Sequence, residues 1–207
     1  MLTGTVFSLN KGKTRSMGDD HDVLSAIFKH SIGEEPIWLS SSNLEGDEQA
    51  DLVNHGGVDK AVCVYPYEHY TYWQERLDLS LPVGAFGENI TMIGVKEADA
   101  HIGDTWKWGG AIVQISQPRR PCFKVAKRHG IKKFPLYIQE TGYSGYYLRV
   151  LQEGEVSVND PLVLIERKSD ISVEFVNQVT YSRNKNLDAI EKLKQLTELS
   201  DAWKESL

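Results

Sequence analysis

The sequence predicts a mainly β protein, namely an antiparallel or mixed β-barrel with peripheral helices, followed by a small unit of three helices. Many short runs of β-forming residues are separated by glycine turns, without a regular alternation of strands and helices. The composition then shifts after Arg167, because residues 172–207 contain no glycine or proline and carry apolar residues at helical spacing. We therefore expect a barrel domain at residues 1–168 and a three-helix domain at residues 169–207.

The expected elements follow from local pattern. Alternation and β-branched or aromatic content predict strands, and the paired glycines Gly109 and Gly110 predict a hairpin. A proline before an apolar repeat favours a helix start, as Pro66 does before Tyr70, Trp73 and Leu77. Residues 14–34 are polar around one apolar patch and allow no assignment. The expected strands are 3–9, 36–39, 61–65, a segment around 90, 105–108, 111–115, 146–151, 154–156 and 161–165, and the expected helices are 67–77, one starting at Cys122, and 132–139.

The C-terminal stretch contains three candidate helix caps. Ser172 precedes Val173, Val176 and Val179, which repeat at helical spacing, and Asn186 and Ser200 stand before two further amphipathic runs. Charges over residues 172–207 nearly cancel, with five basic against six acidic side chains. A DNA-reading helix-turn-helix therefore has little electrostatic support. Covering one face of the barrel is the simplest role, and a docking or dimer surface stays open, so that a homodimer is compatible with the sequence.

The composition argues against several classes of function. The chain has 207 residues and a net charge of −6, which argues against a general nucleic-acid surface while allowing a local anion site. No apolar run approaches the roughly 20 residues of a membrane span, and the first residues lack the pattern of a signal peptide. Two cysteines, Cys63 and Cys122, are too few for a disulfide framework or a closed zinc site. We expect a cytoplasmic, reducing setting.

Cys122 is the leading candidate for chemistry. It follows a strand and Pro121, so it is expected at the N-terminus of a short helix, close to Arg119, Arg120 and Lys124. A helix N-terminus and nearby cations both favour thiolate over thiol. Cys122 is thus a candidate reactive or metal-binding sulfur, although the same pattern fits a buried cysteine beside a surface basic cluster. Cys63 lies within an apolar run and reads as a structural residue.

A second set of polar residues surrounds two glycine-containing loops. Gly56 and Gly57 allow positive φ and close approach of backbone N–H groups to an anion. His55 could donate a proton near neutral pH and Lys60 could contact phosphate, or the segment is only a polar turn before a strand. The second loop contains Gly84 and Gly87. There Asn89 could orient a substrate amide or an oxygen at a reaction centre, and Glu88 could move a proton or fix the turn.

Four stretches together resemble the MOSC domain family, and in particular its YiiM-type branch. The resemblance extends over essentially the whole chain, including the glycine- and tyrosine-rich residues 142–150 and the three-helix C-terminus. Each piece alone is weak, and the combination is specific. The stretches are Gly-Asp-Glu-Gln-Ala-Asp at 46–51, His-Gly-Gly-Val-Asp-Lys-Ala-Val at 55–62, Gly-Glu-Asn-Ile at 87–90 and Pro-Arg-Arg-Pro-Cys-Phe-Lys at 118–124.

The resemblance implies a MOSC-type β-barrel and a molybdenum cofactor, a pyranopterin dithiolene whose metal takes Cys122 as a protein ligand. It also implies reduction of N-hydroxylated compounds, such as hydroxylamino nucleobases, by N–O cleavage. The residues expected to contact the cofactor are Arg119, Arg120, Lys124, Lys60, Gly56 and Gly57, and those expected in catalysis are Cys122, His55 and Asn89.

The sequence has no GxGxxG fingerprint and no further cysteines for an iron–sulfur cluster. The implied reductase would therefore take electrons from a separate flavin or iron–sulfur protein. Two other classes stay open: a non-catalytic carrier of the cofactor or of sulfur on Cys122, and a binding module for a purine-like anion in which Cys122 is incidental.

Overall fold

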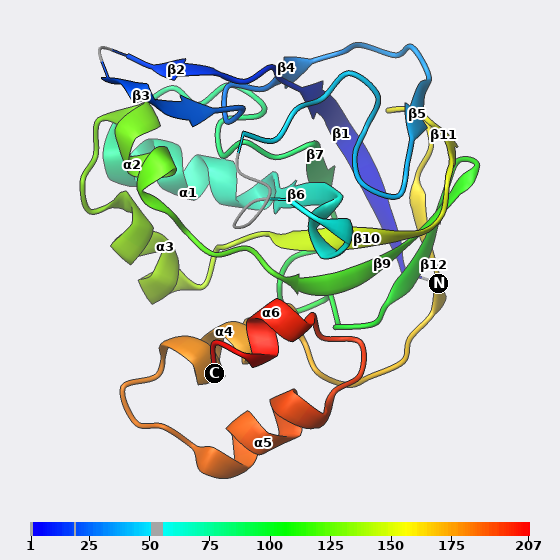
Figure 1. Ribbon diagram of the computed structural model, residues 1–207, viewed down its shortest axis with the longest axis vertical. Coiled ribbons are helices and arrows are strands. Elements are labelled where there is room, and N and C mark those ends of the chain that lie inside the picture. Colours follow the sequence, from blue (N-terminus) through cyan, green and yellow to red (C-terminus); the bar gives the residue numbers. More distant parts are fainter. Residues whose placement is uncertain (1, 19, 51–55) are drawn as a thin grey trace.

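A closed barrel forms the centre of the computed structural model, which describes residues 2–18, 20–50 and 56–207 (Figure 1). Seven strands follow one another in the order β12-β8-β9-β10-β6-β7-β1, and a further pairing of β1 with β12 closes the ring. The strands are β1 (Thr3–Lys11), β2 (Arg15–Met17), β3 (Asp20–Ser25), β4 (His30–Ser31), β5 (Ile37–Leu39), β6 (Val62–Pro66), β7 (Ile90–Ile93), β8 (Thr105–Trp108), β9 (Ala111–Pro118), β10 (Tyr146–Gln152), β11 (Gly154–Val156) and β12 (Leu162–Glu166).

The barrel is mixed, which is one of the two arrangements that the sequence left open. Strands β6 and β7 run parallel, with Val64 opposite Ile90, and the other pairings in the ring are antiparallel. The closing pair aligns Gly4 with Leu162. Closure removes the free strand edges that would otherwise present unpaired backbone groups. Inside, a packed core contains the tryptophans of β8, Trp106 and Trp108, both at most 2% exposed.

Three helices pack beside the barrel. They are α1 (Glu68–Leu77), α2 (Phe123–His129) and α3 (Phe134–Thr141), all lying on one side in Figure 1. Tyr70 and Trp73 of α1 are buried as predicted, in an aromatic cluster with Tyr65 and Phe86. The Trp73 indole N–H donates to the Tyr65 hydroxyl at 2.7 Å, so the polar atom of this large side chain is satisfied inside the core.

The C-terminal helices are capped where the sequence predicts. Ser172 accepts a hydrogen bond from the backbone N–H of α4 (Val173–Tyr181), Asn186 from that of α5 (Leu187–Gln195), and Ser200 from that of α6 (Asp201–Lys204). Trp203 of α6 and Val176 of α4 belong to the same apolar core as the barrel. The helices therefore pack against the barrel beside β9, where the Ser200 hydroxyl donates to Gln117. The division between residues 168 and 169 stays a prediction.

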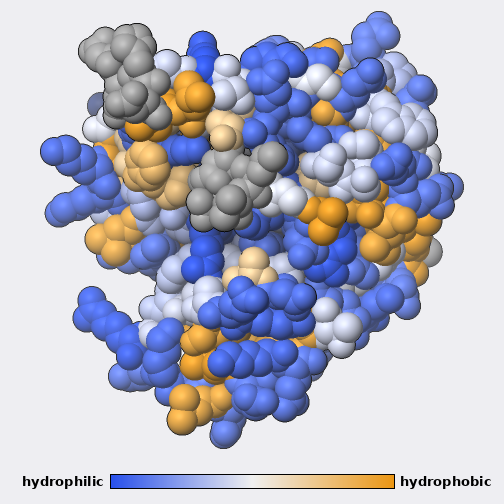
Figure 2. Space-filling view, viewed as in Figure 1, coloured by the Kyte–Doolittle hydropathy of each residue, from blue (hydrophilic) through white to orange (hydrophobic). Residues whose placement is uncertain are grey.

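Residues 14–34 contain the structure that the sequence left unassigned. Strands β2 and β3 pair as a short hairpin, and the two-residue strand β4 extends the sheet beside β1. Within the described residues no helix is long and apolar enough to cross a membrane. The face shown in Figure 2 is mainly hydrophilic, with exposed apolar side chains in small separate patches.

Candidate functional site

Cys122 lies between the barrel and α2. Strand β9 ends at Pro118, three residues continue the chain, and Cys122 is the residue immediately before the first turn of α2. Its backbone is extended, with φ −128° and ψ 167°, and its side chain makes no capping hydrogen bond to the helix. The side chain is half-buried. The sequence prediction of a short helix beginning at this cysteine is confirmed.

A cavity that is open to solvent includes Cys122 in its wall. Its floor comes from β6, β10 and the loop before β7, which supply Cys63, Tyr147 and Asn89. Basic side chains also line the cavity, and the segment at residues 25–29 and the loop at residues 47–50 complete the wall. Of the sequence-predicted residues, the cavity wall contains Cys122, Asn89, Arg119, Lys124 and Lys60.

Arg119 provides the strongest anion-binding feature. Its side chain is buried, with the residue 6% exposed, and Nη2 donates to the carbonyl oxygen of Phe86 at 2.5 Å. Within the described part of the chain, the buried Nη1 has no hydrogen-bond partner of good geometry, and the Tyr147 side chain lies near the same guanidinium. Burial disfavours the charge, but Cys63, Tyr147 and Cys122 favour it when they are ionised, so the pKa of the guanidinium is raised and Arg119 stays charged at neutral pH. An unpartnered, charged donor beside an open cavity is a site that an anionic ligand would satisfy.

Lys124 and Lys60 add positive charge to the same cavity. Lys124 is on the first turn of α2 and is 9% exposed. Lys60 ends a short 3₁₀ helix, Val58–Lys60, and its carbonyl oxygen accepts from Gln49 Nε2 at 3.3 Å. The two lysines come from distant segments, Lys60 from the residues before β6 and Lys124 from α2. The predicted gathering of these two lysines with Arg119 and Cys122 is therefore found in the structure.

A buried ion pair forms another part of the wall. Lys29 Nζ lies 2.5 Å from Asp47 Oδ2, and both side chains are almost fully buried, at 7% and 1% exposure. Asp47 also accepts hydrogen bonds from the Gly12 backbone N–H at 2.7 Å and from Asn89 Nδ2 at 2.8 Å. Asp47 thus ties the hairpin side of the cavity to the loop before β7. Neither Lys29 nor Asp47 was identified from the sequence as a site residue, although Asp47 lies within the motif at 46–51.

Asn89 and Glu88 are held by their own hydrogen bonds. Asn89 Oδ1 accepts from the Cys63 backbone N–H at 3.0 Å, and Nδ2 donates to Asp47 and to the Asn10 carbonyl oxygen. Glu88 is fully buried and accepts from Tyr70, Thr91 and the backbone N–H groups at positions 84 and 86. Glu88 therefore fixes the turn, the second of the two roles that the sequence left open.

Cys63 is a second sulfur in the cavity wall. It is buried, and this burial raises the pKa of its thiol to about 11, so the thiol stays protonated at neutral pH. The expectation that Cys63 is a structural residue in an apolar strand fits its place in β6. The sequence carried no signal that its side chain would face the cavity shared with Cys122.

Three predicted cofactor contacts do not line the cavity in the structure. Arg120 lies 4.3 Å above the Trp203 ring and donates to the Ser206 hydroxyl, so it faces the C-terminal helices. Successive side chains of an extended segment point in opposite directions, which sends Arg119 inward and Arg120 outward. Gly56 and Gly57 precede the 3₁₀ helix, and Gly57 has φ 95°, the positive value expected for it. His55 lies outside the described residues.

Comparisons with known proteins agree with this architecture. Residues 51–163 match the family model described as MOSC domain, and residues 171–207 match the one described as YiiM-like, 3-alpha helix domain. The uncharacterized protein YflK of Bacillus subtilis is 46% identical over 98% of this chain and 92% of its own length. A protein of Gibberella moniliformis named "Reductase" is 32% identical over 93% of this chain, which spans 35% of that longer protein.

Two solved structures are also similar. YiiM from Geobacillus stearothermophilus superposes with a TM-score of 0.84 at 36% identity, covering 98% of this chain and 96% of that one. YiiM from Escherichia coli superposes with a TM-score of 0.79 at 29% identity, covering 99% and 90%. Fold, motif and family models thus agree, and the chain belongs to the MOSC domain family, with a YiiM-like three-helix domain at its C-terminal end.

Proposed function

We propose that the chain is a reductase of N-hydroxylated compounds that carries a molybdenum cofactor on Cys122. The observation that carries the proposal is the cavity whose wall includes both the half-buried Cys122 and the buried guanidinium of Arg119. The relative named "Reductase" supports oxidoreductase chemistry at the level of the family.

The residues fit such a cofactor. Sulfur is a soft ligand of the kind that suits molybdenum in thiolate form. The buried Arg119 leaves one nitrogen for an anion, and Lys124 and Lys60 add two cations on the same wall. A dithiolene cofactor with a phosphate is anionic, so these groups would hold it by charge-assisted hydrogen bonds. Arg120, which packs on Trp203, is left out of the proposed cofactor contacts.

When bound, the cofactor supplies two-electron reduction with transfer of the substrate oxygen. Two electrons and two protons convert an N–OH group into N–H and one molecule of water. In this proposal the chain binds the planar, N-hydroxylated substrate in the cavity, and His55 or water supplies a proton to the departing oxygen. Asn89 acts as a positioning residue, because its hydrogen bonds fix Asp47 and the Cys63 backbone beside the reaction site.

The test is turnover of a hydroxylaminopurine by protein made in a cofactor-competent host, with dithionite-reduced methyl viologen as electron source. We expect the aminopurine as product, and we expect the rate to fall by more than about a hundredfold in Cys122→Ala because a ligand is lost. Molybdenum-loaded protein that forms no aminopurine would overturn the reductase proposal. Sulfane sulfur on Cys122 without metal would favour a sulfur carrier instead.

A further inference from the structure

The charge of the chain is strongly uneven around Cys122. Between Asp104 and Glu140 there are eight lysine and arginine residues and no aspartate or glutamate, although the chain as a whole carries a net charge of −6. The remaining residues therefore contain 15 basic against 29 acidic side chains. Seven of the eight cations fall within residues 119–133, the segment that forms α2 and its flanks. Charge of one sign gathered in one place raises the local potential and attracts partners of opposite sign.

Only part of this charge is used by the cavity. Arg119 and Lys124 are buried and line it. Lys127 on α2 and Lys132 and Lys133 in the connection to α3 are exposed instead. Figure 1 shows α2 and α3 side by side along one flank of the molecule. Lys132 and Lys133 therefore present positive charge to the solvent between the two helices, one of which contains the cavity residue Lys124.

An exposed aromatic residue stands on the same helix as Lys127. Phe123 is 58% exposed, and it is the first residue of α2. Positions four apart in a helix share a face, so Phe123 and Lys127 point to the same side. A single exposed apolar residue needs no explanation alone. An aromatic anchor bordered by charge is, however, the composition of a protein-binding surface. We call Phe123, Lys127, Lys132 and Lys133 the α2 face.

The α2 face is also close to the proposed reaction centre. Phe123 follows Cys122 directly, and consecutive Cα atoms are about 3.8 Å apart. The conversion of N–OH into N–H and water consumes two electrons in every turnover, so the electrons must come from an external source. A donor docked at Phe123 would deliver them next to Cys122.

We propose that the α2 face is the docking surface for an acidic one-electron donor protein that carries a flavin or an iron–sulfur cluster. This inference rests on the proposed reductase function. The donor gives up two electrons in two successive one-electron steps, and the substrate takes both of them with two protons. Positive charge on the α2 face steers the acidic donor, and Phe123 packs against its apolar centre.

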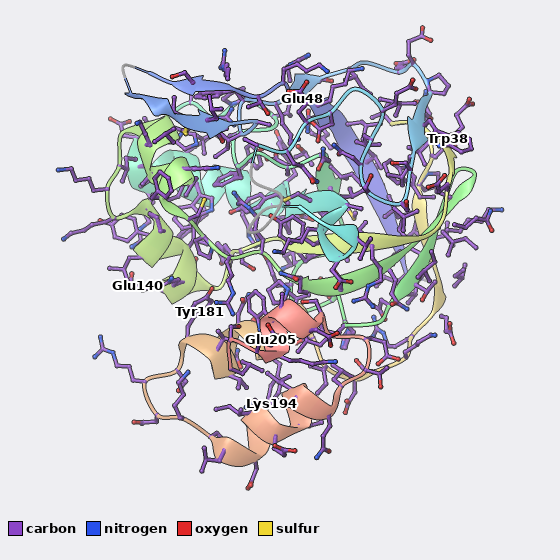
Figure 3. The ribbon with its side chains drawn as sticks, in the orientation of Figure 1. Trp38, Glu48, Glu140, Tyr181, Lys194 and Glu205 are labelled. Carbon is purple, nitrogen blue, oxygen red and sulfur yellow. The ribbon has the colours of Figure 1, made fainter. Side chains whose placement is uncertain are left out.

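The experiment measures binding and turnover separately. An acidic flavodoxin and an acidic plant-type ferredoxin serve as probes, and calorimetry measures their Kd for the full chain at low and at physiological ionic strength. The test variants are Lys132→Glu/Lys133→Glu and Phe123→Ser. The control Lys192→Glu/Lys194→Glu makes the same change in net charge on α5, and Figure 3 shows Lys194 far from α2.

We expect at least one probe to bind wild type, more weakly as salt is added. The Lys132→Glu/Lys133→Glu variant should weaken this binding on the order of tenfold more than the control. Turnover with reduced methyl viologen should be unchanged in both test variants. The docking proposal is overturned if neither probe binds, if the two charge-reversed variants bind alike, or if single-stranded DNA outcompetes both donors on this face. Lack of turnover with methyl viologen in loaded wild type would instead refute the reductase function.

Discussion

Replacing Asp47 by alanine should destabilise the protein strongly, because Asp47 is the shared partner of three groups in the cavity wall. The change leaves the ammonium of Lys29 without its carboxylate, and that side chain is only 7% exposed. Removing one member of a buried pair costs about 3–5 kcal/mol. The Gly12 N–H and Asn89 Nδ2 also lose their acceptor, but the open cavity admits water to replace it. We therefore expect a loss of about 4 kcal/mol.

For a chain of this length, 1 kcal/mol corresponds to about 2–4 °C, so Tm should fall by about 8–16 °C. Glu48→Ala is the matched control, because Glu48 lies next to Asp47, its ion pair with Lys13 is exposed, and it accepts a backbone hydrogen bond from the Thr14 N–H at 2.7 Å. It should cost about 1 kcal/mol, because no buried charge is left alone. Adding Lys29→Met to Asp47→Ala should restore part of the loss, since no buried charge is then left alone. Calorimetry that found equal Tm values for Asp47→Ala and Glu48→Ala would refute the role given to this ion pair.

Three further predictions follow from single groups. Iodoacetamide at pH 8 should alkylate Cys122 and spare Cys63, whose pKa is raised to about 11; peptide mapping that found Cys63 labelled first would contradict this. Burial lowers the pKa of His129, so the folded protein keeps this side chain neutral. The free energy of unfolding should therefore fall as the pH drops below about 6.5, where the unfolded chain takes up the proton. In His129→Gln, the free energy of unfolding measured by urea titration should depend less steeply on pH. Ser200→Ala should cost about 1–2 kcal/mol of stability, because Ser200 caps α6. It should also speed alkylation of Cys122, because the Ser200 hydroxyl binds Gln117 at the end of β9, from which the chain continues to Cys122. Asn186→Ala removes the cap of α5 and should leave the alkylation rate unchanged.

Local signals in the sequence were sufficient for much of the fold. The caps at Ser172, Asn186 and Ser200 act within one helical turn, so the sequence alone identifies them. Strand β1, whose side chains alternate between exposed and buried, and strand β10, which is rich in aromatic and aliphatic residues, were also predictable. The hairpin of β2 and β3 was not, because its strands are short and its register is irregular. Parallel pairing of β6 with β7 depends on contacts between distant segments, which periodicity does not encode.

The candidate site, too, was predictable from the sequence only in part. Motif and local charge were enough to bring Cys122, Arg119, Lys124 and Lys60 together in prediction, and they line one cavity. The opposite orientations of Arg119 and Arg120 depend on how the segment leaves β9, which nothing in two adjacent arginines reveals. Lys29 and Asp47 are separated by 18 positions and meet only through the fold. Such tertiary pairs were out of reach of the sequence.

The measurement that tests the central claim most directly is the molybdenum content of wild type and of Cys122→Ser, both purified from the same cofactor-competent host. Serine keeps the size of the side chain and removes the soft sulfur, and Cys63→Ser controls for loss of the other cavity thiol. We expect stoichiometric molybdenum in wild type and in Cys63→Ser, and near-complete loss in Cys122→Ser. Wild-type molybdenum retained by Cys122→Ser would contradict the account, because the sulfur at the entry to α2 would then not hold the metal.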